Sequence, residues 1–333
     1  MGEIKSMNRL RCQLANDSER LFFSLVDYRN SRFTSSDPHK IIEFYNSFKD
    51  KDDLIEWMQE RPKGFANIHE VNGNKEIIVV IPTADFNGKY AKECMENIFK
   101  GLHILFVESG GRGDFYFNSA HNINKGVKKA LEYNPKWIVV SGDDMIKVDP
   151  INKLINGLSK IDNSSIDTVI TFPSSYHSAP MILCSPNIVF KTAIKVLRFI
   201  SRRVYYAEKA YSQMRRFNNH ILFPRYENSP SLLYRFINYV LFKKYKNFVN
   251  ILSFGIFSSN FIRRSGELYD ETYINEMEDT DLSVRLSDAG RVATVDFTIK
   301  EKTGATLGHG ILRTLRTVPG WSYFSYKMDR GEL

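Results

Sequence analysis

The chain has 333 residues, of which 43% are hydrophobic and 13% aromatic, and it carries a net charge of +8. This composition excludes a disordered chain and predicts one principal domain with a large core and an accessory segment. The three cysteines, Cys12, Cys94 and Cys184, have no paired or metal-type spacing, so neither a disulfide framework nor a zinc site is expected.

The distribution of apolar residues bears on location. The first residues mix charges and lack an apolar signal core, and no run approaches the ~18 apolar residues of a spanning helix. We therefore expect neither secretion nor membrane spanning. Cysteine usage favours a reducing interior, so the predicted location is cytoplasmic.

The first 72 residues differ in pattern from the rest of the chain. Residues 38–48 and 52–59 have helical periodicity, and residues 61–64, Arg-Pro-Lys-Gly, break it. We interpret residues 1–72 as an accessory N-terminal helical region. Residues 73–333 then form the principal domain.

From Glu76 onward, apolar runs alternate with helical patterns. The apolar runs are residues 77–81, 104–107 and 138–140, and helical patterns cover residues 90–99 and 123–133. Alternation of this kind predicts an α/β fold with a mostly parallel central sheet flanked by helices.

Polar residues follow the first two predicted strands. They are Pro82, Thr83, Ala84 and Asp85 after the first strand, and Glu108, Ser109 and Gly110 after the second. Ligands bind at the carboxyl ends of parallel strands, so these residues are candidate nucleotide contacts. The glycines match neither the dinucleotide nor the phosphate-loop spacing, and an ordinary surface turn is the alternative.

An acidic pair follows the third predicted strand. Asp143 and Asp144 come after the apolar run 137–140, so they would face the same crevice and offer hard oxygen ligands to a divalent cation. The alternative is a solvated turn, because Gly-Asp-Asp is ordinary turn composition.

Positive charge is concentrated in residues 191–246, which hold 13 Lys and Arg against Glu208 and Glu227. Aromatic residues are interleaved with these cations, and residues 232–241 have a helical apolar face. An anionic membrane surface, a phosphate-bearing lipid acceptor or nucleic acid would suit such a segment. The alternative is a pair of solvated helices whose aromatic residues lie in the core.

A second acidic group lies in the last quarter of the chain. Glu278, Asp279 and Asp281 open a helical pattern, where a carboxylate could serve as a general base. They could equally be a first helical turn favoured by the helix dipole. His309 lies between two glycines, which would permit close approach to a ligand.

In this order, the motifs resemble those of family 2 glycosyltransferases, which have a GT-A fold. The resemblance covers residues from about 76 to 330. The chain departs from the family's pattern at two positions and matches it in two further segments. Ser141 and Gly142 stand where the family carries acidic residues, and residues 257–264 resemble the family's acceptor-side strand. The motif Glu-Asp-Thr-Asp-Leu at 278–282 is the strongest match.

The resemblance implies a GT-A fold with a helical basic insert at 191–250. It also implies an inverting, metal-dependent transfer of a sugar from a UDP- or GDP-linked donor to a hydroxyl of a glycan, lipid-linked or protein acceptor. The implied catalytic base is Asp279, and Glu278 and Asp281 are supporting or acceptor residues. Other implied residues are Asp143, Asp144 and His309 for Mg²⁺ or Mn²⁺, and Asn124, Gly126 and Asp143 for the nucleotide.

Three other functions stay open. A sugar-nucleotide-binding protein without catalysis is consistent with Ser141 and Gly142 at the expected acidic position. A nucleotidyltransferase would also combine an α/β nucleotide site with a metal. Nucleic-acid binding is disfavoured, because the basic segment lacks a recognisable reading motif. A peripheral position on the inner face of a membrane would fit the basic insert.

Overall fold

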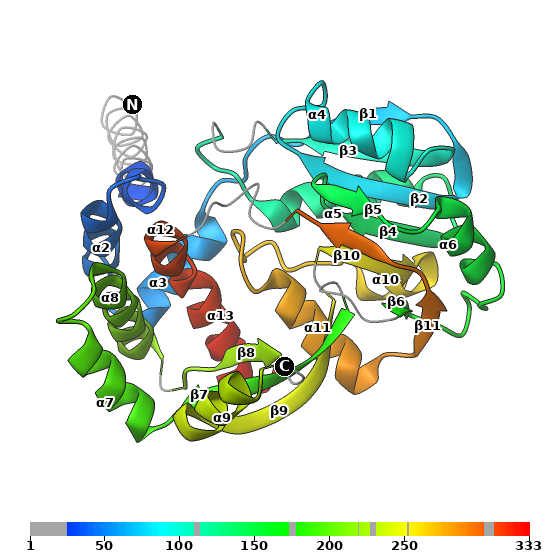
Figure 1. Ribbon diagram of the computed structural model, residues 1–333. Coiled ribbons are helices and arrows are strands. Elements are labelled where there is room, and N and C mark those ends of the chain that lie inside the picture. Colours follow the sequence, from blue (N-terminus) through cyan, green and yellow to red (C-terminus); the bar gives the residue numbers. More distant parts are fainter. Residues whose placement is uncertain are drawn as a thin grey trace, which may run out of the picture.

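The computed structural model describes residues 25–109, 114–172, 178–218, 220–226, 231–251, 253–302 and 310–333. It is an α/β structure in which a central sheet with its helices lies on one side and a largely helical part lies on the other (Figure 1). The coarse prediction of an α/β fold with a mixed, mostly parallel sheet flanked by helices is therefore confirmed.

The central sheet has seven strands. Their order across the sheet is β1 (Asn67–Val71), β3 (Leu102–Glu108), β2 (Asn74–Thr83), β4 (Trp137–Ser141), β10 (Phe254–Ser258), β6 (Thr168–Phe172) and β11 (Val292–Asp296). β1 and β10 run antiparallel to their neighbours, and the other strands are parallel to one another. The carboxyl ends of β2, β3 and β4 therefore meet at one edge.

Helices cover both faces of this sheet because its central strands are apolar on both sides. In β2, Ile77, Val79 and Ile81 belong to one buried cluster, and Ile78 and Val80 to another. The first cluster includes α4 (Lys89–Glu93), the π-helix η1 (Cys94–Ile98) and α6 (Ile151–Leu158). The second includes α5 (Ser119–Leu131), α10 (Ser259–Ser265) and α11 (Glu278–Ala289).

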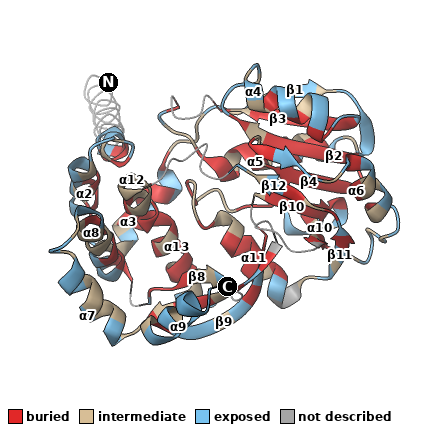
Figure 2. Cartoon of the chain, viewed as in Figure 1, coloured by how far each residue is buried: buried red, intermediate tan, exposed pale blue. Residues whose placement is uncertain are grey.

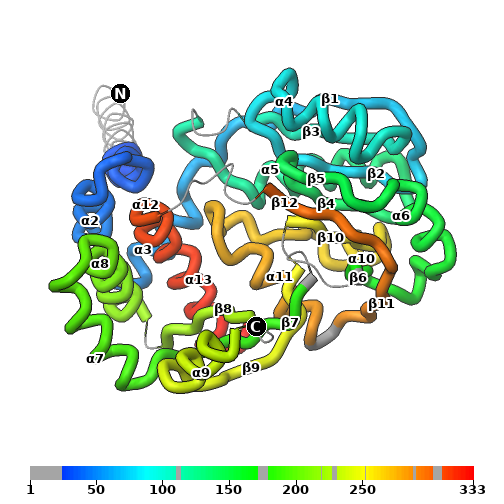
Figure 3. Tube along the Cα trace, viewed as in Figure 1, coloured from blue at the N-terminus to red at the C-terminus, as the bar shows by residue number. Residues whose placement is uncertain are grey.

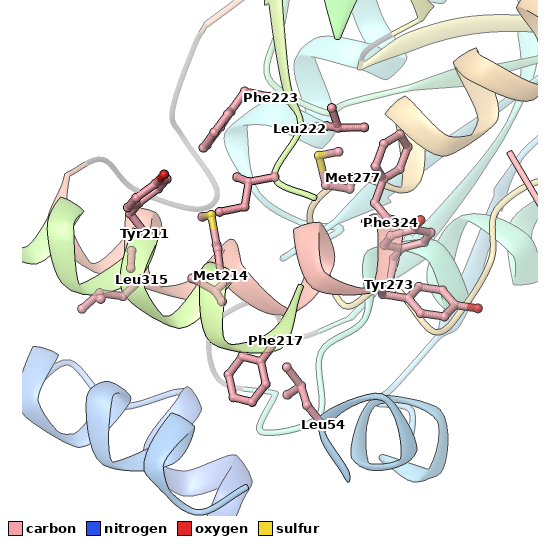
Figure 4. Close-up of a cluster of buried hydrophobic side chains, with 14 of the residues drawn as sticks. Leu54, Tyr211, Met214, Phe217, Leu222, Phe223, Tyr273, Met277, Leu315 and Phe324 are labelled. Carbon is pink, nitrogen blue, oxygen red and sulfur yellow. The ribbon is translucent and has the colours of Figure 1, made fainter. Parts of the chain in front are cut away.

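The helical part has a third hydrophobic core. It joins α2 (Pro38–Asn46) and α3 (Lys51–Glu60) to α8 (Arg202–Phe217), α12 (Ile311–Arg316) and α13 (Val318–Asp329). Figure 4 shows Leu54 of α3 and Phe217 of α8 within this cluster, together with Met277 from the segment before α11. The trace shows α2 beside α8, and α3 packs against α13 (Figure 3).

Two smaller sheets lie outside the central one. β5 (Met145–Lys147) pairs antiparallel with β12 (Ile299–Glu301), directly after the Asp143–Asp144 pair. The other sheet has the order β8 (Phe223–Tyr226), β7 (Ser178–Pro186) and β9 (Phe242–Ile251). α7 (Ile188–Leu197) follows β7, and α9 (Leu232–Leu241) precedes β9.

Three boundaries differ from the sequence predictions. β1 lies before residue 73 yet belongs to the central sheet, because it pairs with β3. The insert at 191–250 is only partly helical: in β9, Phe248 and Asn250 are buried while Val249 is exposed, a period of two that suits a strand. Residues 259–264 of the expected acceptor-side strand form α10 instead, where Ser258 caps the helix by accepting the Phe261 N–H.

None of the helices within the described ranges combines the length and the apolar composition needed to cross a bilayer.

Candidate active site

The first acidic site lies where β4 leaves the sheet. All five residues of β4 are buried, with β2 on one side and β10 on the other. Asp144 is buried and Asp143 is half-buried in the turn that follows. The strand therefore delivers both carboxylates to the edge at which ligands bind in open α/β sheets.

Asp143 is held by the end of the neighbouring strand. Its Oδ2 accepts a hydrogen bond of 2.8 Å from the Thr83 hydroxyl, which joins the carboxyl ends of β2 and β4. Burial raises the pKa of Asp143, and the bond from Thr83 opposes this rise. Thr83 thus orients the carboxylate and favours its ionised form.

Asp144 lies in an acidic environment. Burial raises its pKa to about 6, and the negative charges of Glu301 and Asp143 contribute, while Lys302 opposes them. Glu301 lies on β12 opposite Met145, the residue that follows Asp144. Within the described part of the chain, no lysine or arginine forms an ion pair with Asp143 or Asp144. Their negative charge is left without a cationic partner there.

A divalent cation fits this pair through its ligand chemistry. Among the described residues, no group of three or more His, Cys, Asp or Glu side chains is arranged to hold a metal by itself. Mg²⁺ commonly uses one or two carboxylates and takes its remaining ligands from water and substrate phosphates. Two adjacent carboxylates with raised pKa values suit that mode. His309, the third predicted ligand, lies outside the described residues.

The turn after β2 contains the first predicted nucleotide contacts. Pro82 is half-buried, Thr83 is buried, and Ala84 and Asp85 are exposed. The Asp85 carboxylate accepts the Asn87 N–H at 2.9 Å, which closes the turn toward α4. The exposed residues are accessible to a ligand at the sheet edge.

Glu108 holds the same turn from the end of β3. Its two oxygens accept from the Phe86 N–H at 3.0 Å and contact His69 Nε2 at 2.9 Å. The hydrogen bond from Phe86 contributes most to lowering the pKa of Glu108, and the bond with His69 lowers it further. Glu108 is therefore ionised at neutral pH. The His69 ring stacks on the Phe86 ring with centroids 4.3 Å apart. Ser109 donates its N–H to the Thr83 carbonyl at 3.1 Å, whereas Gly110 lies outside the described residues.

Half-buried Asn124 and buried Gly126, both predicted to contact the nucleotide, contact neighbouring segments of the chain. The Asn124 side chain donates to the Tyr269 carbonyl at 2.7 Å and accepts the Tyr269 N–H at 3.1 Å. A Cβ on Gly126 would lie 2.4 Å from a Val80 methyl group and 2.7 Å from a Val107 methyl group. Asn124 anchors the segment before α11, and Gly126 lets α5 pack closely on the sheet.

The second acidic site is the first turn of α11. Met277, immediately before it, has φ 77° and ψ −7°, a left-handed conformation that is uncommon for a residue with a side chain. Its buried side chain packs into the helical core (Figure 4). Strain of this kind concentrates at functional sites and costs about 1–3 kcal/mol.

Glu278 and Asp279 have raised pKa values at this helix start. Burial raises the pKa of Glu278 most, and the adjacent charge of Asp279 raises it further. Burial also raises the pKa of Asp279, and the charge of Glu276 contributes. The Ser119 hydroxyl donates to Glu278 Oε1 at 2.5 Å, but the buried Glu278 Oε2 has no hydrogen-bond partner among the residues that the structure describes. An unsatisfied buried oxygen next to an acidic neighbour favours the protonated form of Glu278.

Asp281 supports the helix and is not exposed to a ligand. Its fully buried carboxylate accepts from Lys327 Nζ at 2.6 Å, from Arg285 Nε at 2.8 Å and from the Tyr273 hydroxyl at 3.0 Å. These contacts join α11 to α13. Asp281 therefore has a structural role in the contact between these helices.

The second acidic site is tied, through the start of α5, to the edge of the central sheet at which β3 ends. α5 begins at Ser119, after the carboxyl end of β3, and the Ser119 N–H donates to the Ile274 carbonyl at 3.1 Å. Ser119 thereby fixes the segment before α11 and holds Glu278 at that edge. Among the described residues, no hydrogen bond or ion pair joins the two acidic sites. A cavity of about 380 Å³ lies elsewhere, between α11, β6 and β9.

Sequence reasoning missed several residues of this edge. His69, Phe86, Ser119, Glu276 and Glu301 belong to no motif, and only their tertiary neighbours give them a role. Comparisons of the chain with models of known protein families, with curated proteins and with solved structures found no match. The chemistry of the site is therefore the basis for a functional proposal.

Proposed function

We propose that this chain is an inverting, metal-dependent glycosyltransferase that moves a sugar from a nucleoside diphosphate to an acceptor hydroxyl. The proposal rests mainly on one observation. Two acidic pairs far apart in the sequence, Asp143–Asp144 and Glu278–Asp279, have raised pKa values, and the first follows β4 while the second is held by Ser119 at the start of α5. Perturbed carboxylates at a strand-end crevice are typical of catalytic sites.

Asp279 is the proposed general base. The acceptor hydroxyl must lose a proton as its oxygen attacks the anomeric carbon, and a carboxylate with a raised pKa accepts that proton better than an ordinary aspartate. Glu278 Oε2 has no hydrogen-bond partner among the described residues, whereas Asp279 Oδ1 accepts from the Thr280 N–H at 2.6 Å, so Glu278 holds the proton of the pair. Asp279 is then the ionised member.

Asp143 and Asp144 are the proposed ligands of Mg²⁺ or Mn²⁺. When bound, the cation would act as a Lewis acid toward the departing diphosphate. The protein's own contribution is orientation, because Thr83 holds Asp143 in one position and Glu301 concentrates negative charge beside Asp144. Diphosphate oxygens would complete the coordination that two carboxylates leave open.

The proposed nucleoside site is the turn at 82–85 with Glu108. Glu108 is ionised, and its lone pairs could also accept from a ribose or base edge. The stacked rings of His69 and Phe86 lie against the same carboxylate. Gly142, which stands where the resemblance leads us to expect an acidic residue, donates its N–H to the Ser253 carbonyl at 2.9 Å.

The topology supports a GT-A assignment without deciding it. Antiparallel β10 lies between the parallel strands β4 and β6, and the small β5–β12 sheet follows the acidic pair directly. The sequence resemblance likewise implies a mixed, mostly parallel sheet flanked by helices.

The test is a panel of UDP- and GDP-sugars screened for Mn²⁺-dependent thermal stabilisation, because a ligand of the folded state raises its stability by mass action. Product analysis follows for each ligand that stabilises the chain. Release of the nucleoside diphosphate with sugar transfer or hydrolysis supports the proposal. Transfer of a nucleotidyl group would assign a nucleotidyltransferase instead, and stabilisation without turnover would assign a binding protein. If no nucleotide sugar stabilises the chain, the proposal fails.

A further inference from the structure

Helices α7 and α9 expose an unusual amount of apolar surface. No residue of either helix is buried. Of the ten residues in α9, eight are aliphatic or aromatic, and Leu232, Phe236 and Tyr239 are 75%, 65% and 84% exposed. Just beyond α7, Phe199 is 80% exposed. A ten-residue helix of this composition gains little stability in water, since most helical stability comes from packing an apolar face.

These exposed side chains lie on and beside two neighbouring helices. α7 and α9 pack against each other, and the Asn187 side chain at the start of α7 donates to the Val240 carbonyl at 2.6 Å. Both helices lie at the end of the molecule away from the central sheet, and both are coloured only as intermediate or exposed in Figure 2. We call this surface the α7–α9 face. Its exposed large apolar residues are Ile188, Val189, Val196, Leu197, Phe199, Ile200, Leu232, Leu233, Tyr234, Phe236, Ile237, Tyr239 and Val240.

The charges around the α7–α9 face have one sign. Residues 188–203 contain five Lys and Arg, residues 231–246 contain four, and neither stretch contains an acidic residue. Lys195, Arg202, Arg235 and Lys243 are among the exposed cations. Glu208, five residues beyond the first stretch, pairs with Arg198 at 3.4 Å. The two segments that form the α7–α9 face therefore combine exposed apolar residues with positive charge.

We propose that the α7–α9 face binds an anionic lipid surface, with α9 lying in the plane of the interface. A helix with large apolar and aromatic residues among lysines and arginines is the composition of interfacial helices, whose apolar side enters the boundary between headgroups and acyl chains. Tyr234 and Tyr239 suit the headgroup level, because each has an apolar ring and a polar tip. The surrounding cations attract anionic headgroups and can extend toward them.

The positive charge of the α7–α9 face favours an anionic lipid surface over a second copy of the chain as its partner. Two copies meeting through the α7–α9 face would bring like charges together, and lysine is depleted in the cores of protein interfaces. An anionic membrane neutralises the same charges. This inference does not depend on the proposed transferase activity, since binding to lipid needs neither a donor sugar nor a metal.

The experiment is co-sedimentation of the full chain with vesicles of phosphatidylcholine alone or with 30% phosphatidylserine, at low and high salt and without nucleotide. We expect binding only to the phosphatidylserine vesicles, weakened by salt. The double variant Leu233→Ser/Phe236→Ser should lose on the order of tenfold or more in affinity for the vesicles. The reason is that serine side chains bury less apolar area in the lipid than leucine and phenylalanine do. Lys243→Gln/Lys244→Gln should lose on the order of tenfold.

Two control variants carry matched changes away from the α7–α9 face. Phe65→Ser removes a side chain that is 69% exposed, and Lys160→Gln removes an exposed cation. Both should bind vesicles as the wild type does. Unchanged circular dichroism of the apolar variant would show that it is folded. The proposal is overturned if the wild type does not bind vesicles or if Leu233→Ser/Phe236→Ser binds them as the wild type does. It is also overturned if the wild type self-associates without binding vesicles and the same double variant abolishes that self-association.

Discussion

Replacing Asp144 with asparagine should make the metal-free protein more stable at neutral pH. Asp144 loses its proton near pH 3.8 in an unfolded chain and near 6 in the folded protein. Between these values the unfolded state binds fewer protons, so folding stability falls as pH rises through the window and the loss is complete above it. At 1.36 kcal/mol per pKa unit, the loss reaches ~3 kcal/mol.

The Asp144→Asn variant carries no charge at this position, so its folding stability does not fall in this way as pH rises. With an unfolding entropy of about 2.1 cal/mol/K per residue, ~3 kcal/mol corresponds to about 4 °C in the unfolding midpoint of a chain this long. The gain should be present at pH 8 and should disappear near pH 4. Added Mn²⁺ should stabilise the wild type and not the variant, because the variant has lost one proposed ligand.

Thermal melts between pH 4 and pH 8, with and without Mn²⁺, measure both effects. Asp149→Asn is the matched control, because the Lys153 ammonium and the Thr298 N–H lower the pKa of the Asp149 carboxyl. Removing this carboxylate should reduce stability at neutral pH. A metal-free Asp144→Asn protein that melts below the wild type at pH 8 would refute the assignment of unfavourable charge to Asp144.

Four further outcomes are expected. Asp279→Asn should retain donor binding and lose turnover by on the order of 10²–10⁴, and wild-type turnover would exclude it as the base. Because burial raises the pKa of Asp279, the acid limb of the kcat/KM profile should lie at higher pH than for an ordinary aspartate; a limb at the usual position would contradict this. Lys327→Met removes one of the two cations that hold the buried Asp281 carboxylate and leaves Arg285, so it should cost about 1.5–3 kcal/mol in denaturant unfolding. Gly126→Ala should destabilise the fold by about 1–3 kcal/mol, since the new methyl would lie 2.4 Å from a valine methyl; weaker donor binding at unchanged stability would instead support a nucleotide contact.

Much of the central sheet could be predicted from the sequence. Residues 77–81, 104–107 and 138–140 lie within β2, β3 and β4, and the helical patterns at 38–48 and 123–133 correspond to α2 and α5. These segments are predictable because strands buried on both faces must be continuously apolar and because helices repeat every 3.6 residues. β9 was missed because its lysines interrupt the apolar alternation that marks a strand.

The candidate site was only partly predictable. Asp143, Asp144, Glu278 and Asp279 follow recognisable patterns, and the structure shows Thr83 holding Asp143 and Ser119 holding Glu278. The interior roles of Asn124 and Gly126 could not be read from the sequence, because a polar side chain or a glycine looks the same whether it faces a ligand or a neighbouring segment. Only the contacts with Tyr269 and Val80 distinguish the two.

The sequence by itself determined the α/β class, the carboxylates at the strand and helix ends, and the positive charge of residues 191–246, since each depends on local order along the chain. The tertiary structure alone decided that Glu301 lies beside Asp144, that Lys327 pairs with Asp281, and that the apolar residues of α9 face outward. The physical reason is that burial and charge pairing depend on segments distant in sequence, whose relative positions are set by packing the whole chain.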